Sequence, residues 1–257
     1  MKTASPTSRP AIWHAQMLAW GPVIIMIVLS WLYLVTMRTC APDALVHNSA
    51  AMGHVGQNEL IWAIIMWNMM MAAMMLPTAM PAISLFGTLC ARRTQVLSPR
   101  TSSLFYIVGY LASWSGYSVA AATLQWGLLH LQILNHMTMS LNAGLSVFVL
   151  VVAGIFQFTS LKEACLSKCR TPMAFFLSEW RDGTRGAFIL GLRHGTFCVA
   201  CCWALMAVMF VVGTMNILWM AILTIFVLCE KIAPPSWHTS QAGGIALLVW
   251  AAIIACF

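Results

Sequence analysis

Long stretches without a charged residue constrain this chain more than any other feature of its sequence. No Asp, Glu, Lys or Arg lies between Glu59 and Arg92, or between Arg100 and Lys162. The core of a lipid bilayer is about 30 Å thick, and a helix needs about 20 apolar residues to cross it. Charged residues make up only 7% of the chain, against about 25% in soluble domains. The sequence therefore predicts an integral membrane protein and leaves no soluble alternative.

The predicted fold class is all-α: a polytopic transmembrane helical bundle that forms a single domain over residues 1–257. Within lipid only a helix satisfies its own backbone hydrogen bonds, apart from a closed barrel. The sequence contains no internal repeat and no soluble module. About seven spans are predicted, at residues 17–37, 60–85, 104–125, 141–161, 186–212, 215–228 and 243–256.

The placement of Lys and Arg predicts a cytoplasmic N-terminus. With that orientation, twelve of the thirteen cations fall in cytoplasmic segments, Lys162 and Lys231 among them, and only Arg38 lies outside. Such a bias is typical of membrane proteins. The net charge of +7 is therefore a topology signal with affinity for anionic lipid headgroups. It does not indicate nucleic-acid binding, because the cations are spread over separate segments.

Sulfur and imidazole side chains are unusually abundant. The chain holds nineteen Met, nine Cys and seven His. Thiolate and thioether ligands favour Cu(I), while imidazole also suits zinc and iron. Met and Cys are also ordinary apolar side chains that fill a membrane interior. Clustering therefore decides which residues are candidate ligands.

The sharpest cluster lies in the span 186–212. At about 100° per residue, His194, Cys198 and Cys201 fall within about 60° of one another, with Cys202 at the flank. This helix face is a candidate metal site, and close packing by small side chains is the alternative. A short turn near Thr214 predicts an antiparallel hairpin that places two further candidates, Cys229 and Glu230, at the depth of the Cys group.

Glu230 has two alternative roles. An ionisable side chain inside a membrane segment usually has a partner, and Arg193 is one candidate partner. Glu230 is otherwise a metal ligand, or an acceptor that orients His194.

A second cluster lies in the span 60–85, where seven of the fifteen residues from Met66 to Met80 are Met. Met66, Met70 and Met74 follow one another at i, i+4 and i+8 on one side of the helix. They form either a thioether ladder for Cu(I) or a flexible packing surface. Sets that are weaker as sites lie at both membrane faces: Cys40, Asp43, His47, Met52, His54, His130, His136, Met137 and Met139 outside, and Cys165, Cys169 and His238 inside.

Several motifs together resemble those of a bacterial family of uncharacterised, predicted metal-binding integral membrane proteins. They are residues 67–77 (WNMMMAAMMLP), 157–162 (QFTSLK) with Cys165 and the run 169–172, 191–195 (GLRHG) through Cys198 to Met206, 213–216, and Glu230-Lys231. The resemblance covers about residues 60–232, and Ala200 stands where the family pattern has Gly. It implies a location in the bacterial inner membrane and metal binding through His194 and the matching Cys residues.

Three functions fit these features. The first is copper handling, by transport or by delivery to a metal-donor or metal-acceptor protein or a membrane complex, with zinc or iron as other ions. The second is a membrane metalloenzyme, or a subunit of a copper or iron redox complex. The third is a structural assembly factor that binds no metal. The chain has only six acidic residues, so few carboxylates are available to act as the acid and the base of a hydrolytic enzyme.

Overall fold

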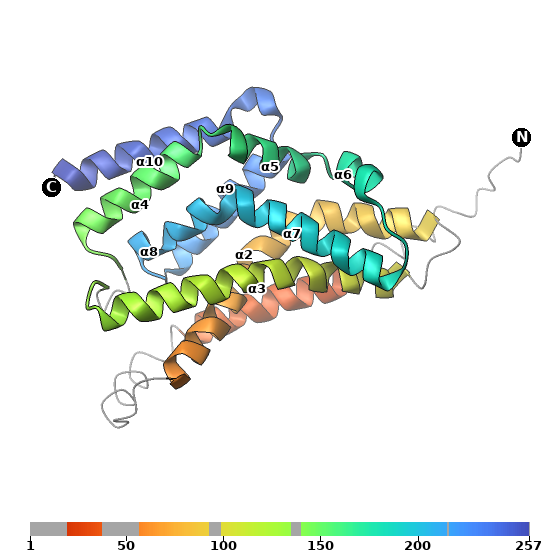
Figure 1. The fold of residues 1–257 in the computed structure, drawn as a ribbon, viewed down its shortest axis with the longest axis horizontal. Coiled ribbons are helices and arrows are strands. Elements are labelled where there is room, and N and C mark those ends of the chain that lie inside the picture. The colour runs from red at the N-terminus through yellow and green to blue at the C-terminus, as the bar shows by residue number, and fades with distance from the viewer. Residues whose placement is uncertain (1–19, 38–56, 93–98, 135–139, 215, 257) are drawn as a thin grey trace, which may run out of the picture.

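The computed structural model describes residues 20–37, 57–92, 99–134, 140–214 and 216–256, and these are helical with no strand among them. An N-terminal helix, Trp20–Met37, comes first. The others in chain order (Figure 1) are α2 Gln57–Arg92, α3 Pro99–His130, α4 Ala143–Phe156, α5 Ser160–Arg170, α6 Pro172–Glu179, α7 Gly183–Ala207, α8 Met209–Val212, α9 Ile217–Ile232, the 3-10 turn Pro235–Trp237, and α10 Thr239–Cys256.

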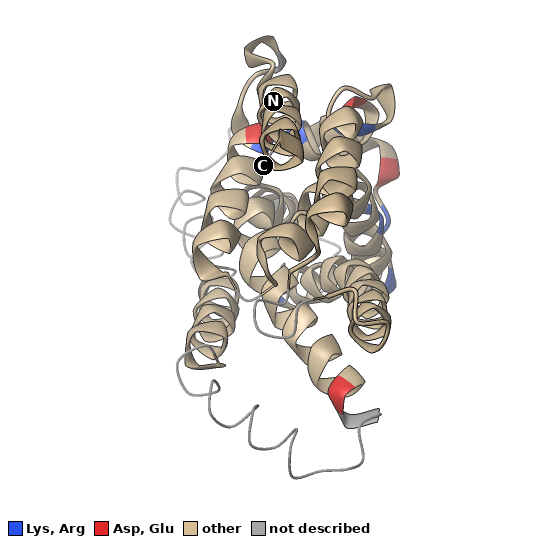
Figure 2. Ribbon diagram, turned by 90° about the vertical axis from the view of Figure 1, so that its left-hand side faces the viewer, with Lys and Arg blue, Asp and Glu red and all other residues tan. Residues whose placement is uncertain are grey.

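The described parts of the seven predicted ranges are mostly helical, but 141–161 is divided between α4 and α5 and 186–212 between α7 and α8. The helices are also not all equally suited to crossing a membrane. Four are long and apolar enough: Trp20–Met37, Glu59–Ala91, Gly183–Val212 and Thr239–Cys256. A fifth is added if α4 and α5, which meet at a bend of 65°, count as one span. The described residues therefore give four or five candidate spans, and seven spans remain a prediction. The ribbon carries few charges over most of its length (Figure 2).

Two breaks in the helices have local causes. The predicted span 141–161 is interrupted after Phe156, where Thr159 accepts a hydrogen bond from the Lys162 amide and so begins α5. The pair Pro234-Pro235 follows the end of α9. Pro77 and Pro81 lie inside the continuous helix α2.

Close backbone approach joins α3 to α7, and α3 also packs against α2. A Cβ atom on Gly191 would overlap the carbonyl oxygen of Tyr106, and one on Gly109 would overlap that of Phe188. Glycine at these positions lets the two helices touch, as small residues do in membrane bundles. The contact fixes Tyr106 and Tyr110 beside the face of α7 that carries the cysteines. On the other side of the molecule, α4 and α10 run side by side (Figure 1).

Two of the cations that the sequence assigned to cytoplasmic segments are buried in the bundle. Lys162 is 1% exposed and Lys231 is 8% exposed. The prediction of orientation counts Lys and Arg residues at the membrane surface, and neither of these buried side chains lies at a surface. Both instead take part in polar contacts between helices.

Candidate metal centre

The predicted thiol face of α7 is buried in the core. Cys198, Cys201 and Cys202 are fully buried, and His194 is 2% exposed. The Sγ atoms of Cys201 and Cys202 lie 3.2 Å apart, and the Cys201 thiol donates to the carbonyl oxygen of Cys198 at 3.2 Å. All three cysteines are free thiols. Helical periodicity therefore correctly predicted which residues share this face.

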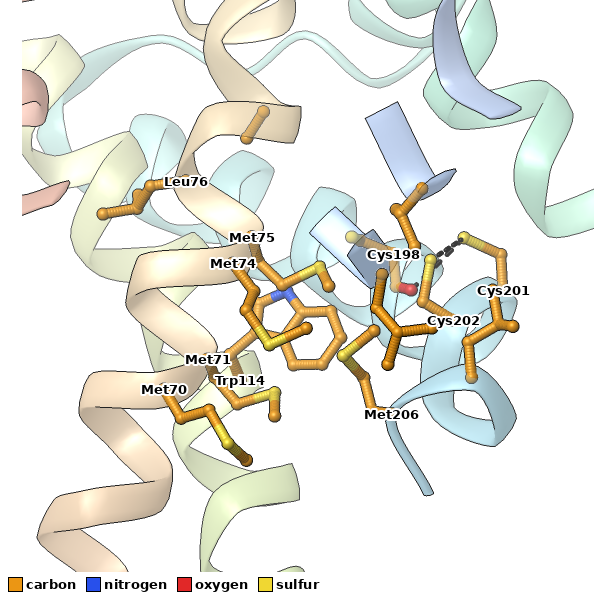
Figure 3. Close-up of a cluster of buried hydrophobic side chains, with 14 of the residues drawn as sticks. Met70, Met71, Met74, Met75, Leu76, Trp114, Cys198, Cys201, Cys202 and Met206 are labelled. Carbon is orange, nitrogen blue, oxygen red and sulfur yellow. Dashed lines mark hydrogen bonds between the residues drawn. The ribbon is translucent and has the colours of Figure 1, made fainter. Parts of the chain in front are cut away.

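The methionine face of α2 meets this thiol face. Figure 3 shows Met75 of α2 directed toward Cys198 of α7, and Met74 of α2 directed toward Met206 of α7. These four side chains are completely buried in one continuous core cluster. The sequence left open whether the two faces meet, and the fold brings them together. Met66 and Met70 are buried in the same cluster, one turn after another along α2.

Tyr110 of α3 links the two faces through one hydroxyl group. This hydroxyl lies 3.1 Å from the Sγ atom of Cys198 and donates to the carbonyl oxygen of Met75 at 3.3 Å. The side chain is fully buried. A third helix thus fixes the spacing between a thiol of α7 and the methionine-rich segment of α2.

Lys231 of α9 makes a second link. Its Nζ atom donates to the Cys198 Sγ atom at 3.1 Å and to the Thr78 hydroxyl of α2 at 2.7 Å. An ammonium group at this distance is the counter-charge that a buried thiolate requires. Sequence reasoning counted Lys231 as a cytoplasmic cation and as part of the Glu230-Lys231 motif, but did not predict that it contacts Cys198. The signal that could have found it is its position directly after Glu230 in an apolar helix, because adjacent helical residues point about 100° apart and need separate partners.

His194 lies on the same face of α7 but already has a hydrogen-bond partner. Its Nδ1 atom lies 2.5 Å from the Tyr106 hydroxyl. The ring packs between those of Tyr110 and Phe175, with centroid distances of 5.6 and 5.7 Å. Only Nε2 is free of this hydrogen bond, so any metal bond from His194 has to form there or replace Tyr106.

Glu230 pairs with neither of the groups considered from the sequence. Its carboxylate oxygens accept from Lys162 Nζ at 2.7 and 2.9 Å, and Lys162 also donates to Gln157. Arg193, the partner proposed from the sequence, instead pairs with Glu179. The predicted antiparallel register compares only the levels of residues on the two helices, so it could not show on which side of α9 the carboxylate points.

The remaining candidate residues differ in whether they are buried, exposed or outside the described residues. Cys229 is exposed on α9, whereas Cys165 and Cys169 of α5 are buried. His130 and His238 are exposed. The other members of the weaker outer set lie outside the described residues: Cys40, Asp43, His47, Met52, His54, His136, Met137 and Met139.

In the part of the chain that the structure describes, no group of three or more His, Cys, Asp or Glu side chains is arranged to hold a metal ion. The donors gathered around Cys198 are thiols together with thioethers. A metal site here therefore depends on Met as well as Cys, or on rotation of the thiols about their side-chain bonds.

A comparison with protein families gives a match that covers most of the chain. A family model described as "PpoB2: Copper chaperone" matches residues 64–254. The chain belongs to this copper chaperone family. The matched region extends from the methionine-rich part of α2 through the thiol face of α7 to α10. Membership of a copper chaperone family agrees with the copper handling that the soft side chains predicted. No curated protein and no solved structure matches the chain.

Proposed function

We propose that this protein binds Cu(I) between α2 and α7 and passes it to an acceptor protein. The observation that carries the proposal is the meeting of the two sulfur-rich faces, with Met75 directed toward Cys198 and Met74 toward Met206 (Figure 3). Thiolates and thioethers are the ligands that select Cu(I) over harder ions. Family membership supports delivery as the role of this copper.

The proposed ligands are the α7 thiols Cys198, Cys201 and Cys202 with the nearby thioethers. His194 stays a candidate through Nε2. Met66 lies about 12 Å along the helix axis from Met74, at 1.5 Å per residue, so these two cannot bind one ion together. Met66 and Met70 belong to the proposal as a continuation of the thioether surface along α2. Cys229 and Glu230 are left out, because the first is exposed and the second is neutralised by Lys162.

A membrane location is part of the proposal. Apolar side chains lie exposed along the helices, among them Ile25, Leu29, Ile225 and Ile253, each more than half exposed. Exposed apolar surface on this scale suits lipid contact. We propose multi-pass insertion in the bacterial inner membrane, with the N-terminus in the cytoplasm.

Copper stoichiometry tests the proposal. Full-length protein purified in detergent is loaded with Cu(I) under reducing conditions, and bound copper per chain is measured after desalting. The wild type is expected to retain copper, and a Cys198→Ser/Cys201→Ser/Cys202→Ser variant to lose it. A Cys229→Ser/Cys256→Ser variant, which removes two exposed thiols, is the matched control and should retain copper. Equal copper in the wild type and the triple variant would contradict the proposed site.

Delivery requires that bound copper can leave. Copper-loaded wild type is challenged with a chromogenic Cu(I) chelator, and transfer is followed by absorbance. Complete and reversible transfer is expected of a chaperone. A fixed enzyme centre would instead keep its copper in the presence of excess chelator.

A further inference from the structure

Lys231 is a buried cation that has no carboxylate partner among the described residues. The adjacent Glu230 carries the nearest negative charge along the chain, but its carboxylate is held by Lys162 at 2.7 Å. The Lys231 ammonium points to a different group of helices, where it contacts Thr78 and Cys198. Thr78 is neutral, so of these two hydrogen-bond partners only Cys198 can supply a negative charge.

An unpaired charge is unfavourable in a buried, apolar surrounding. An apolar side chain of similar size would fill the same volume of the core without a charge. Packing alone therefore does not require a lysine at position 231. Lys231 instead places its ammonium 3.1 Å from Cys198 Sγ, next to two further buried thiols, Cys201 and Cys202. This arrangement suits a metal site in which the thiolates and the bound ion together carry a negative charge.

We propose that Lys231 sets the charge selectivity of the site in favour of a monovalent soft cation. The inference rests on the proposed function. A monovalent ion bound by two of the three proposed thiols as thiolates, with the third thiol protonated, carries a net charge of minus one, and the ammonium brings the buried assembly to zero. A divalent ion with the same two thiolates is neutral by itself, so Lys231 leaves an uncompensated positive charge. Lys231 thus favours Cu(I) over Zn²⁺ and other divalent ions without binding metal itself.

A purely structural role makes a different prediction. Lys231 also ties α9 to α2 through Thr78, and loss of that tie would weaken binding of every ion alike. Thr78→Val removes the tie and keeps the charge. Lys231→Gln keeps a donor for Thr78 and removes the charge, and Lys231→Arg keeps a cation. Selectivity between ions of different charge therefore separates the two roles.

The experiment is a competition titration on full-length protein in detergent with Ag(I), an air-stable analogue of Cu(I), and Cd²⁺, a soft divalent ion. The ratio of the two affinities is measured for the wild type and the three variants, and a thermal unfolding scan of each confirms that it is folded. Lys231→Gln is expected to lower the Ag(I)-to-Cd²⁺ affinity ratio by about tenfold or more, from the removal of one nearby charge. Lys231→Arg should restore most of the ratio, and Thr78→Val should leave it unchanged.

An unchanged ratio in Lys231→Gln would overturn the inference while leaving the proposed function intact. A fall in both affinities by the same factor would also overturn it, because that is the result of a structural tie. If Lys231→Gln does not fold, Lys231→Met in the wild-type and Thr78→Val backgrounds replaces it, with the same ratio as the readout. A wild type that binds neither Ag(I) nor Cu(I) would refute the proposed function itself.

Discussion

The Tyr106 hydroxyl and the Nδ1 atom of His194 lie 2.5 Å apart, although 88 residues separate them in the chain. Both side chains are buried, so water cannot replace either partner. Tyr106→Phe is therefore expected to reduce the free energy of unfolding by about 1–3 kcal/mol, the range for a buried polar group left without its partner. Denaturant unfolding of the detergent-solubilised protein measures this change.

Tyr117→Phe is the matched control. Its hydroxyl donates to the carbonyl oxygen of Trp203 at 3.1 Å in a more exposed position than the Tyr106–His194 pair. A loss of about 1 kcal/mol or less is expected. Equal losses in the two variants would show that burial of the Tyr106–His194 pair does not increase its contribution to the free energy of unfolding.

Gly191→Ala is expected to disturb the contact between α3 and α7. The added Cβ atom would overlap the carbonyl oxygen of Tyr106, which is backbone and cannot rotate away. Overpacking of this kind typically reduces stability by about 1–3 kcal/mol. Because the same contact positions Tyr110 beside Cys198, copper affinity should fall as well. Unfolding and Cu(I) titration measure the two effects.

Gly116→Ala on α3 is the control for this substitution, because no atom outside its own helix segment lies within 4 Å of the added Cβ. Alanine is favoured over glycine by about 1 kcal/mol within a helix. This variant should be as stable as the wild type or more so. A Gly191→Ala variant with the same gain would show that α3 and α7 can separate freely.

The buried ion pair of Lys162 and Glu230 predicts a strong asymmetry between single and double variants. Lys162→Met leaves a carboxylate buried without its partner and should destabilise the fold by about 3–5 kcal/mol. A Lys162→Met/Glu230→Leu double variant should recover most of that loss, because an apolar pair of similar volume has no charge to compensate. Unfolding curves of the single and double variants form the test.

The pair of Arg193 and Glu179 provides the comparison, since both side chains are at least one-third exposed. Exposed ion pairs contribute about 0–1 kcal/mol, so Glu179→Ala should scarcely move the unfolding transition. A loss as large as that of Lys162→Met would contradict the argument from burial.

Thiol labelling tests the positions of the cysteines. In a Cys40→Ser background, a membrane-permeant maleimide should react rapidly with Cys229 and Cys256, the two exposed thiols. The six buried thiols should react only on unfolding: Cys90, Cys165, Cys169, Cys198, Cys201 and Cys202. Mass spectrometry of the native and unfolded protein counts the labels. Rapid labelling of Cys198 in the native protein would contradict the buried site.

Much of the helical framework could be predicted from the sequence, because apolar length and the absence of charge act locally. The described parts of all seven predicted ranges are mostly helical, but the breaks after Phe156 and after Ala207 were not predicted. The break after Phe156 had a local signal. The signal was present in Thr159, a residue type that often caps a helix N-terminus. Neither length nor mean apolarity detects such a cap.

The candidate site was predictable only within single helices. The periodicity that aligned Cys198 and Cys201 on α7, and Met70 and Met74 on α2, is a property of one helix. Contacts across helices depend on packing that no spacing encodes. Lys231 beside Cys198 and Lys162 beside Glu230 were therefore not predicted. The same limit explains why Arg193 was the wrong partner for Glu230.

Complete burial of Cys198, Cys201 and Cys202 has a kinetic consequence. Ligand exchange between two copper proteins requires the incoming sulfur to touch the ion before the outgoing one departs, and here no donor of α7 reaches the surface. The rate of copper transfer is then governed by transient separation of the helices and becomes independent of acceptor concentration once the acceptor is abundant. A docking partner would accelerate release only by holding the bundle open.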